Sequence, residues 1–253
     1  GSSTRSSGRG SWPSAPAERL LRVGKGRPSL ADLTYRLQEL DGLARIRYVT
    51  LHPAYITTEL ARAIAECDKA DRFLPLPAQS GSDRVLKAMK RGYTTDLYRR
   101  HVDVLREQVA DIELGSDWIV GFPTETDEDH EASEAFLSEL GFVSNYVFKY
   151  DPRPTTHAAE KLEDDVPVVK KKERNRRLLA RAEDVARKRL ERYVGTRVRA
   201  FVEARSERHP HLVQGRTTHN LPVHFPGDDT LVGSTVEVEV VQATAYGLGA
   251  LPS

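Results

Sequence analysis

Polar and small residues gather where runs of apolar, strand-forming residues end. Gln79 and Ser80 follow the run "RFLPLPA", while Asp117 and Gly121 lie in and directly after the run "SDWIV". The carboxyl ends of parallel strands meet at one edge of a sheet, where polar side chains and helix N-termini bind anions and hydroxyl groups. An aspartate there can hold a ribose hydroxyl or an amino group. These residues indicate a ligand site, and ordinary strand-to-helix turns are the alternative.

An arginine follows a further strand-like run. Arg153 stands between two prolines in "YDPRPTT", and a rigid arginine of this kind can clamp a carboxylate or a phosphate, or simply fix a loop. Both alternatives stay open from the residues alone. The carboxylates Asp127, Glu128 and Asp129 are interpreted instead as first-turn partners of a helix dipole.

A second group of candidate residues is basic, and would bind RNA by neutralising its phosphates. Its members lie in "KKKERNRR" and in the C-terminal region: Lys170, Lys171, Lys172, Arg174, Arg197, Arg199 and Arg216. The alternative for the helical part is a solvated face. No metal site is predicted, because the C-terminal histidines lack accompanying thiols and helical pair spacing.

Alternating segments must position these residues. Strand-like runs at 45–51, 72–79, 112–122 and 146–151 alternate with helical patterns at 58–67, 82–92, 94–109 and 127–140. This alternation predicts parallel βα units. A closed eight-stranded barrel needs about 250 residues by itself, so the sequence predicts a smaller, open α/β sheet or partial barrel.

The C-terminal part changes class. A long basic helical pattern over 167–195 leads into short alternating runs separated by Gly, Pro and Asp, which predict a small antiparallel β-barrel. The predicted organisation is a disordered or non-homologous leader at 1–26, an α/β domain at 27–195 and the barrel at 196–253.

Composition limits the class of protein. The 253 residues carry a formal net charge of +1, so affinity for nucleic acid must come from local patches. No apolar run has the length of a membrane span. The single cysteine, Cys67, excludes an internal disulfide and fits a reducing compartment, so we expect a cytoplasmic protein without membrane contact.

Several long motifs together carry a family resemblance. In order and spacing, "RIRYVTLHP", "LPLPAQSGSDRVLKAMKRGYT", "SDWIVGFPTETDED", "YDPRPTTHAAE" and "QGRTTHNLPVHFPG" resemble the methylthiotransferases of the radical S-adenosylmethionine (radical SAM) superfamily. They favour the MiaB-like members, which modify adenosine in tRNA, with the related MtaB-like members as an alternative. The resemblance implies about four of six strands of a partial radical SAM (β/α) barrel, followed by an RNA-binding TRAM barrel that would contact tRNA.

The resemblance also implies cofactors and their site. Family members use S-adenosylmethionine and two [4Fe–4S] clusters. By position, the contacts to S-adenosylmethionine would fall to Gln79, Ser80, Asp117, Gly121, Phe122, Pro123 and Arg153. The family pattern has glycine where this chain has Thr124 and Thr155, so we expect strain at two turns that need a positive φ.

One departure bears on activity. The family's catalytic cluster needs three thiolates from a CxxxCxxC loop and its second cluster needs three more, whereas this chain has only Cys67. We therefore expect it to bind neither cluster and to be inactive alone, with no catalytic residue assigned, unless a partner or a missing segment completes the barrel. Rival hypotheses are a non-catalytic RNA-binding protein and a cluster-free enzyme that uses His52, Asp117 and Glu125.

Overall fold

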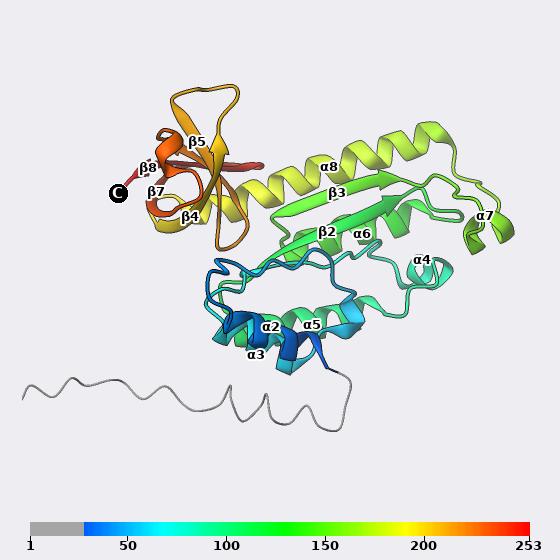
Figure 1. Cartoon of the computed structure of the whole chain (residues 1–253). Coiled ribbons are helices and arrows are strands. Elements are labelled where there is room, and N and C mark those ends of the chain that lie inside the picture. Colours follow the sequence, from blue (N-terminus) through cyan, green and yellow to red (C-terminus); the bar gives the residue numbers. More distant parts are fainter. Residues whose placement is uncertain (1–27) are drawn as a thin grey trace, which may run out of the picture.

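Three parallel strands form the sheet of the α/β domain. They are hydrogen-bonded in the order β1-β2-β3: β1 (Phe73–Pro75), β2 (Glu113–Val120) and β3 (Ser144–Lys149). The structure is a computed structural model that describes residues 28–253, so the predicted leader at 1–26 lies outside the described residues. The predicted α/β class and the C-terminal barrel are both confirmed (Figure 1).

The run 45–51 was predicted as a fourth strand and does not form one. It lies beside β1 with an isolated bridge between Ile46 and Ala70 and a hydrogen bond from Leu51 N–H to Pro75 O (3.0 Å). Pro75 and Pro77 have no N–H to donate, so the ladder with their neighbours cannot continue.

Helices pack against this sheet, and all of them except α8 (Val168–Leu190) begin at a residue whose side chain caps the helix. They are α2 (Leu30–Gln38), α3 (Thr58–Glu66), α4 (Asp83–Ala88), α5 (Thr95–Gln108), α6 (Asp127–Leu140), α7 (His157–Lys161) and α8. α6 has the predicted bounds because Thr126 and Asp129 form a reciprocal capping box and Gly141 ends the helix in a left-handed conformation. No helix in the described part of the chain is long and apolar enough to cross a membrane.

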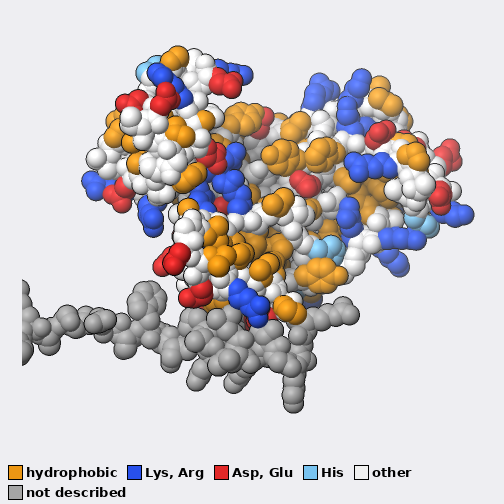
Figure 2. All heavy atoms as spheres, in the orientation of Figure 1, with side chains coloured by type: hydrophobic (Ala, Val, Ile, Leu, Met, Phe, Trp, Pro, Cys, Tyr) orange, Lys and Arg blue, Asp and Glu red, His pale blue; other side chains and the backbone are white. Residues whose placement is uncertain are grey.

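The two faces of the sheet differ in burial. Trp118 of β2 is fully buried and packs edge-on against Phe136 of α6 and Phe142. On the opposite face, Tyr146 and Phe148 of β3 stack on each other and remain 63% and 53% exposed. Figure 2 shows hydrophobic side chains at the surface between the barrel and the far end of the domain. One face of the sheet therefore makes the core, and the other stays open.

The C-terminal barrel closes on itself. Its strands are hydrogen-bonded in the order β4-β5-β6-β8-β7: β4 (Arg197–Arg205), β5 (Leu212–Thr217), β6 (Pro222–Pro226), β7 (Thr235–Thr244) and β8 (Gly247–Pro252). The last of these strands was missed from the sequence because "GLGALP" has little β-branched character. Gly215 is needed at a close crossing, where a Cβ would lie 2.2 Å from Phe201 O.

Buried polar contacts fix the barrel to the α/β domain. The Arg45 guanidinium donates to the backbone oxygens of Arg216 (3.1 Å) and Thr217 (2.5 Å). The fully buried carboxylate of Glu113 accepts hydrogen bonds from Arg189 and from the hydroxyl of Tyr193 (3.0 Å). The Arg45 contacts join the α/β domain directly to the barrel, and the Glu113 contacts fix the end of α8 that leads into the barrel, so the space between the domains has a defined shape.

Candidate functional site

The loop after β1 is fastened to its neighbours. Gln79 has a left-handed backbone (φ 66°). Its N–H donates a hydrogen bond to Asp117 O (2.8 Å), and its C=O accepts one from Ile119 N–H (2.9 Å). Ser80 is fully buried, and its hydroxyl oxygen accepts from Ser82 N–H (3.1 Å). Both proposed cofactor residues thus lie at the strand end, with their backbones or hydroxyl groups already engaged inside the chain.

The loop after β2 packs against side chains of the chain itself. Gly121 has a φ of 70°, and its N–H donates to Glu125 Oε2 (2.6 Å). A Cβ at Gly121 would lie 2.3 Å from Lys171 Cγ, so the stem of Lys171 occupies the space that the sequence suggested for a ligand. Phe122 and Pro123 are buried as well. The chain's own side chains therefore cover this part of the expected cofactor surface.

A buried ion pair links this loop to α8. Arg174 Nη1 lies 2.8 Å from Glu125 Oε2, and the two side chains are 4% and 1% exposed. Burial raises the pKa of Glu125, and the Gly121 N–H and the Arg174 guanidinium oppose that effect. Glu125 is thus a structural partner of Arg174 rather than the free acid–base group of one hypothesis. His52, its suggested companion, caps a short 3₁₀ helix by accepting from Ala54 N–H (3.3 Å).

Two of the basic residues expected to contact RNA lie inside the protein. Lys171 Nζ donates to Asp164 Oδ1 (2.6 Å), and Arg174 is held by Glu125. The prediction that Lys171 and Arg174 contact RNA is wrong, because both residues belong to the buried face of α8. That face consists of positions 171, 174, 178, 182, 186 and 190. Lys172 points outward, and Lys170 is partly exposed and paired with Asp127 at 3.3 Å.

The three candidate arginines of the barrel remain accessible. Arg197 and Arg199 lie exposed on β4, and Arg197 pairs with Glu237 at 3.5 Å. Arg216 on β5 is partly exposed, and its Nη1 donates to Asn220 O (3.1 Å). In the described part of the chain, no group of three or more His, Cys, Asp or Glu side chains is placed to hold a metal ion.

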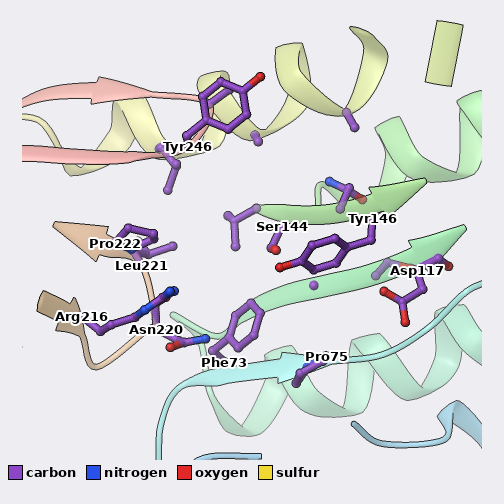
Figure 3. A pocket seen from close by; sticks show the side chains of 18 of the residues that line it. Phe73, Pro75, Asp117, Ser144, Tyr146, Arg216, Asn220, Leu221, Pro222 and Tyr246 are labelled. Carbon is purple, nitrogen blue, oxygen red and sulfur yellow. Dashed lines mark hydrogen bonds between the residues drawn. The ribbon is translucent and has the colours of Figure 1, made fainter. Parts of the chain in front are cut away.

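Among the residues proposed to bind the cofactor, Asp117 lines a cavity. A cavity of about 680 Å³ lies between the open face of the sheet, α8 and the barrel, and Asp117 lines it (Figure 3). Its carboxylate forms no hydrogen bond or ion pair with the described residues, and burial raises its pKa. The Arg153 side chain is exposed beyond β3 and likewise has no ion-pair partner among the described residues. These two charged groups are the ones left free for a ligand.

Two turns have the strain that the sequence predicted. Thr124 and Thr155 both have a φ of 68°, each follows a proline, and each turn is closed by a backbone hydrogen bond three residues apart. These are the features of a type II turn, in which the third residue needs a positive φ and favours glycine. Arg84 donates to both the hydroxyl and the carbonyl oxygen of Thr124 (3.1 and 2.5 Å) and holds that turn, whereas the Thr155 hydroxyl has no partner in the described structure.

Replacing Thr155 with glycine should therefore stabilise the protein by about 0.5–1 kcal/mol. Glycine removes the strain of the left-handed backbone, and this gain should exceed the loss of stability that comes from the greater conformational entropy of glycine in the unfolded chain. Thr124→Gly should be nearly neutral, because it also removes the hydroxyl that binds Arg84. Urea unfolding of the two variants beside the unsubstituted chain measures this. Equal gains for both would show that the Arg84 contact contributes nothing.

His130 of α6 is a buried histidine with neither ring nitrogen hydrogen-bonded in the described structure. Its Nε2 lies 3.4 Å from Glu134 Oε1, but burial dominates and lowers the pKa of His130, assisted by the nearby Arg177 and Arg174. The ring is therefore neutral in the folded protein.

Since the unfolded chain takes up a proton near pH 6.5 and the folded chain only at lower pH, stability should fall as the pH drops below 6.5. Between pH 7 and pH 5 the His130 contribution is about 2 kcal/mol. The measurement is the difference between the pH-dependent unfolding curves of the unsubstituted chain and His130→Leu. If the two curves run parallel from pH 7 to pH 5, His130 is not the group responsible.

Comparison with known proteins identifies the family. Residues 16–137 match the radical SAM superfamily, and residues 191–250 match the TRAM domain. The chain is 42% identical over 223 residues to the tRNA-2-methylthio-N(6)-dimethylallyladenosine synthase of Coxiella burnetii (strain RSA 331 / Henzerling II), covering 87% of this chain and 50% of that protein. By these matches the chain is MiaB-like.

Other relatives carry the same name. The synthase of Janthinobacterium sp. (strain Marseille) is 43% identical over 84% of this chain and 48% of its own length, and that of Aquifex aeolicus (strain VF5) is 38% identical over 86% and 49%. The MiaB-like chain thus spans about half the length of the curated relatives it matches. Among solved structures, coproporphyrinogen III oxidase (HemN) from Escherichia coli matches 56% of the chain and 32% of its own, with 19% identity and a TM-score of 0.47.

The residues of this MiaB-like chain do not fit the iron–sulfur clusters of its family. Cluster iron is bound by several thiolates, and the chain has one cysteine. Cys67 is buried, and its burial raises the pKa of the thiol to about 11, so it stays protonated at neutral pH. No reaction step through a cluster can be derived for these residues.

Sequence reasoning missed several residues that shape the site. The cavity wall contains Tyr146, Tyr246 and Asn220, and the loops are held by the Arg84–Asp129 pair. Only the motif "THNLPVHFPG" carried a signal, because its Asn220 stands at a hairpin position with a positive φ (57°). The others depend on which strands and helices pack together.

Proposed function

We propose that this MiaB-like chain binds tRNA and acts as the RNA-binding part of a tRNA methylthiotransferase system. Its own residues do not bind the iron–sulfur clusters of that reaction. The observation that carries the proposal is the 38–43% identity to proteins named tRNA-2-methylthio-N(6)-dimethylallyladenosine synthase, which extends through both domains. The match to the TRAM domain supports the same partner.

The accessible basic residues support phosphate contact. Lys172 and Arg199 are exposed and have no ion-pair partner in the described structure, and Arg197 and Arg216 lie on the same barrel. Lys171 and Arg174 are left out of the proposed RNA surface because their charges are buried and paired. For S-adenosylmethionine we propose Arg153, whose guanidinium is exposed beyond the end of β3 and has no ion-pair partner in the described structure.

Equilibrium binding of tRNA at a series of salt concentrations tests the proposal. Affinity should fall linearly on a log–log plot, and Lys172→Gln and Arg199→Gln should each reduce the slope by about 1. Arg99→Gln is the control, because Arg99 lies on α5, outside both α8 and the barrel, and pairs with Glu139 (2.7 Å). No binding, or binding that does not depend on salt, would contradict the proposal.

A further inference from the structure

The cavity at the domain junction is built from elements far apart in the sequence. Its walls include Phe73 of β1, Tyr146 of β3, Tyr246 in the turn between β7 and β8, and Asn220 of the barrel. Figure 3 shows these side chains arranged around one hollow. The glycine at 115 forms part of the floor, where a Cβ would lie 2.7 Å from the Phe73 ring.

This cavity is distinct from the strand-end site of the family resemblance. Of the seven residues proposed there for S-adenosylmethionine, only Asp117 lines the cavity. The rest of the lining comes from the run 45–51, from β1, from the first residues of β2 and β3, such as Gly115 and Ser144, and from α8 and the barrel. The cavity therefore lies toward the amino ends of the strands.

The polar groups of the cavity are only partly used within the protein. The Oδ1 atom of Asn220 is buried and has no hydrogen-bond partner in the described structure, and the carboxylate of Asp117 is also without one. The hydroxyl of Tyr246 donates to Glu183 (2.5 Å), and the residue is 72% exposed. These polar groups and aromatic rings are available to a ligand that enters the cavity.

We propose that this cavity receives one unpaired nucleobase of an RNA bound to the barrel. Aromatic rings stack on a base of any kind, an asparagine amide matches the donor and acceptor edge of a base, and a carboxylate accepts from an exocyclic amino group. The volume of about 680 Å³ lies in the range of small-ligand sites. Arg216 at the barrel side of the same cavity places a guanidinium near the path of the RNA backbone. The proposal rests on the proposed function, that the chain binds RNA.

Three exposed tyrosines supply a matched test. Tyr146 and Tyr246 line the cavity, whereas Tyr55 ends a 3₁₀ helix (Pro53–Tyr55) outside it, and the three residues are 63%, 72% and 75% exposed. Because all three are largely exposed, their replacement by alanine should leave folding intact, and urea unfolding verifies this.

The affinity for tRNA is measured for the unsubstituted chain and for Tyr146→Ala, Tyr246→Ala and Tyr55→Ala. Loss of one stacking partner should weaken binding about 5- to 100-fold for the two cavity variants, with an unchanged salt slope, and should leave Tyr55→Ala unaffected. Ultraviolet crosslinking should attach the nucleotide to peptides that contain Tyr146 or Tyr246.

The outcomes separate the two proposals. If the unsubstituted chain does not bind tRNA at all, the proposed function and the cavity proposal both fail. If it binds, but the cavity variants bind as well as Tyr55→Ala, the nucleobase site is excluded while tRNA binding stands. An equal loss in all three variants would also exclude a specific role of the cavity.

Discussion

Replacing Arg174 with methionine should lower the free energy of unfolding by about 3–5 kcal/mol, because the change leaves the buried carboxylate of Glu125 without its counter-charge. The two side chains are 4% and 1% exposed and lie 2.8 Å apart, so water cannot replace the lost partner. The measurement is urea unfolding at neutral pH, with the slope of the transition compared between variants.

Two further variants make the result specific. Adding Glu125→Gln to Arg174→Met removes the stranded charge but keeps an acceptor for the Gly121 N–H (2.6 Å), and should restore much of the loss. Arg177→Met removes an arginine of the same helix that is 40% exposed and pairs with Glu134, and should cost less than about 1 kcal/mol. If Arg174→Met costs no more than Arg177→Met, the buried pair does not hold the loop.

The second large effect concerns the loop after β1. Gly81→Ala should lower the free energy of unfolding by about 3 kcal/mol, because the added Cβ would lie 2.4 Å from Ala132 O, in the backbone of α6. The required shift would also lengthen the hydrogen bond from Gly81 N–H to Ser133 Oγ (2.8 Å). The position therefore needs glycine for the close approach of the loop to the helix.

Gly92→Ala is the matched control for this substitution. A Cβ at Gly92 would have nothing within 4 Å, so its replacement should change stability by less than about 0.5 kcal/mol. Both variants are compared by urea unfolding. Similar stabilities of the two would mean that α6 moves away at little cost and that the loop is not tightly packed.

The sequence was most informative where local signals and burial agree. α6 begins and ends at the predicted residues because a capping box and a terminal glycine define it, and Thr124 and Thr155 have the positive φ that the glycine pattern implied. The parallel strands β2 and β3 were also recognised, since each contains a run of β-branched and aromatic residues, "WIV" in β2 and "YVF" in β3.

The remaining features depend on contacts between distant segments. The run 45–51 has the composition of a strand. It does not form one, because Pro75 and Pro77 in the neighbouring segment have no N–H to donate to it. Lys171 looked like a surface charge, yet its position in the buried stripe of α8 places its stem over Gly121. The cavity needs Phe73, Tyr146 and Tyr246 together, and no local pattern records that arrangement.

This MiaB-like chain carries a radical SAM-like α/β fold and a TRAM barrel, and we expect it to hold no iron–sulfur cluster with its own residues. Analysis of iron and acid-labile sulfide after anaerobic reconstitution tests this central claim most directly. The chain should retain no more of either than the Cys67→Ser variant, because its one thiol is buried and protonated. Stoichiometric iron and sulfide that are lost in Cys67→Ser would contradict the claim.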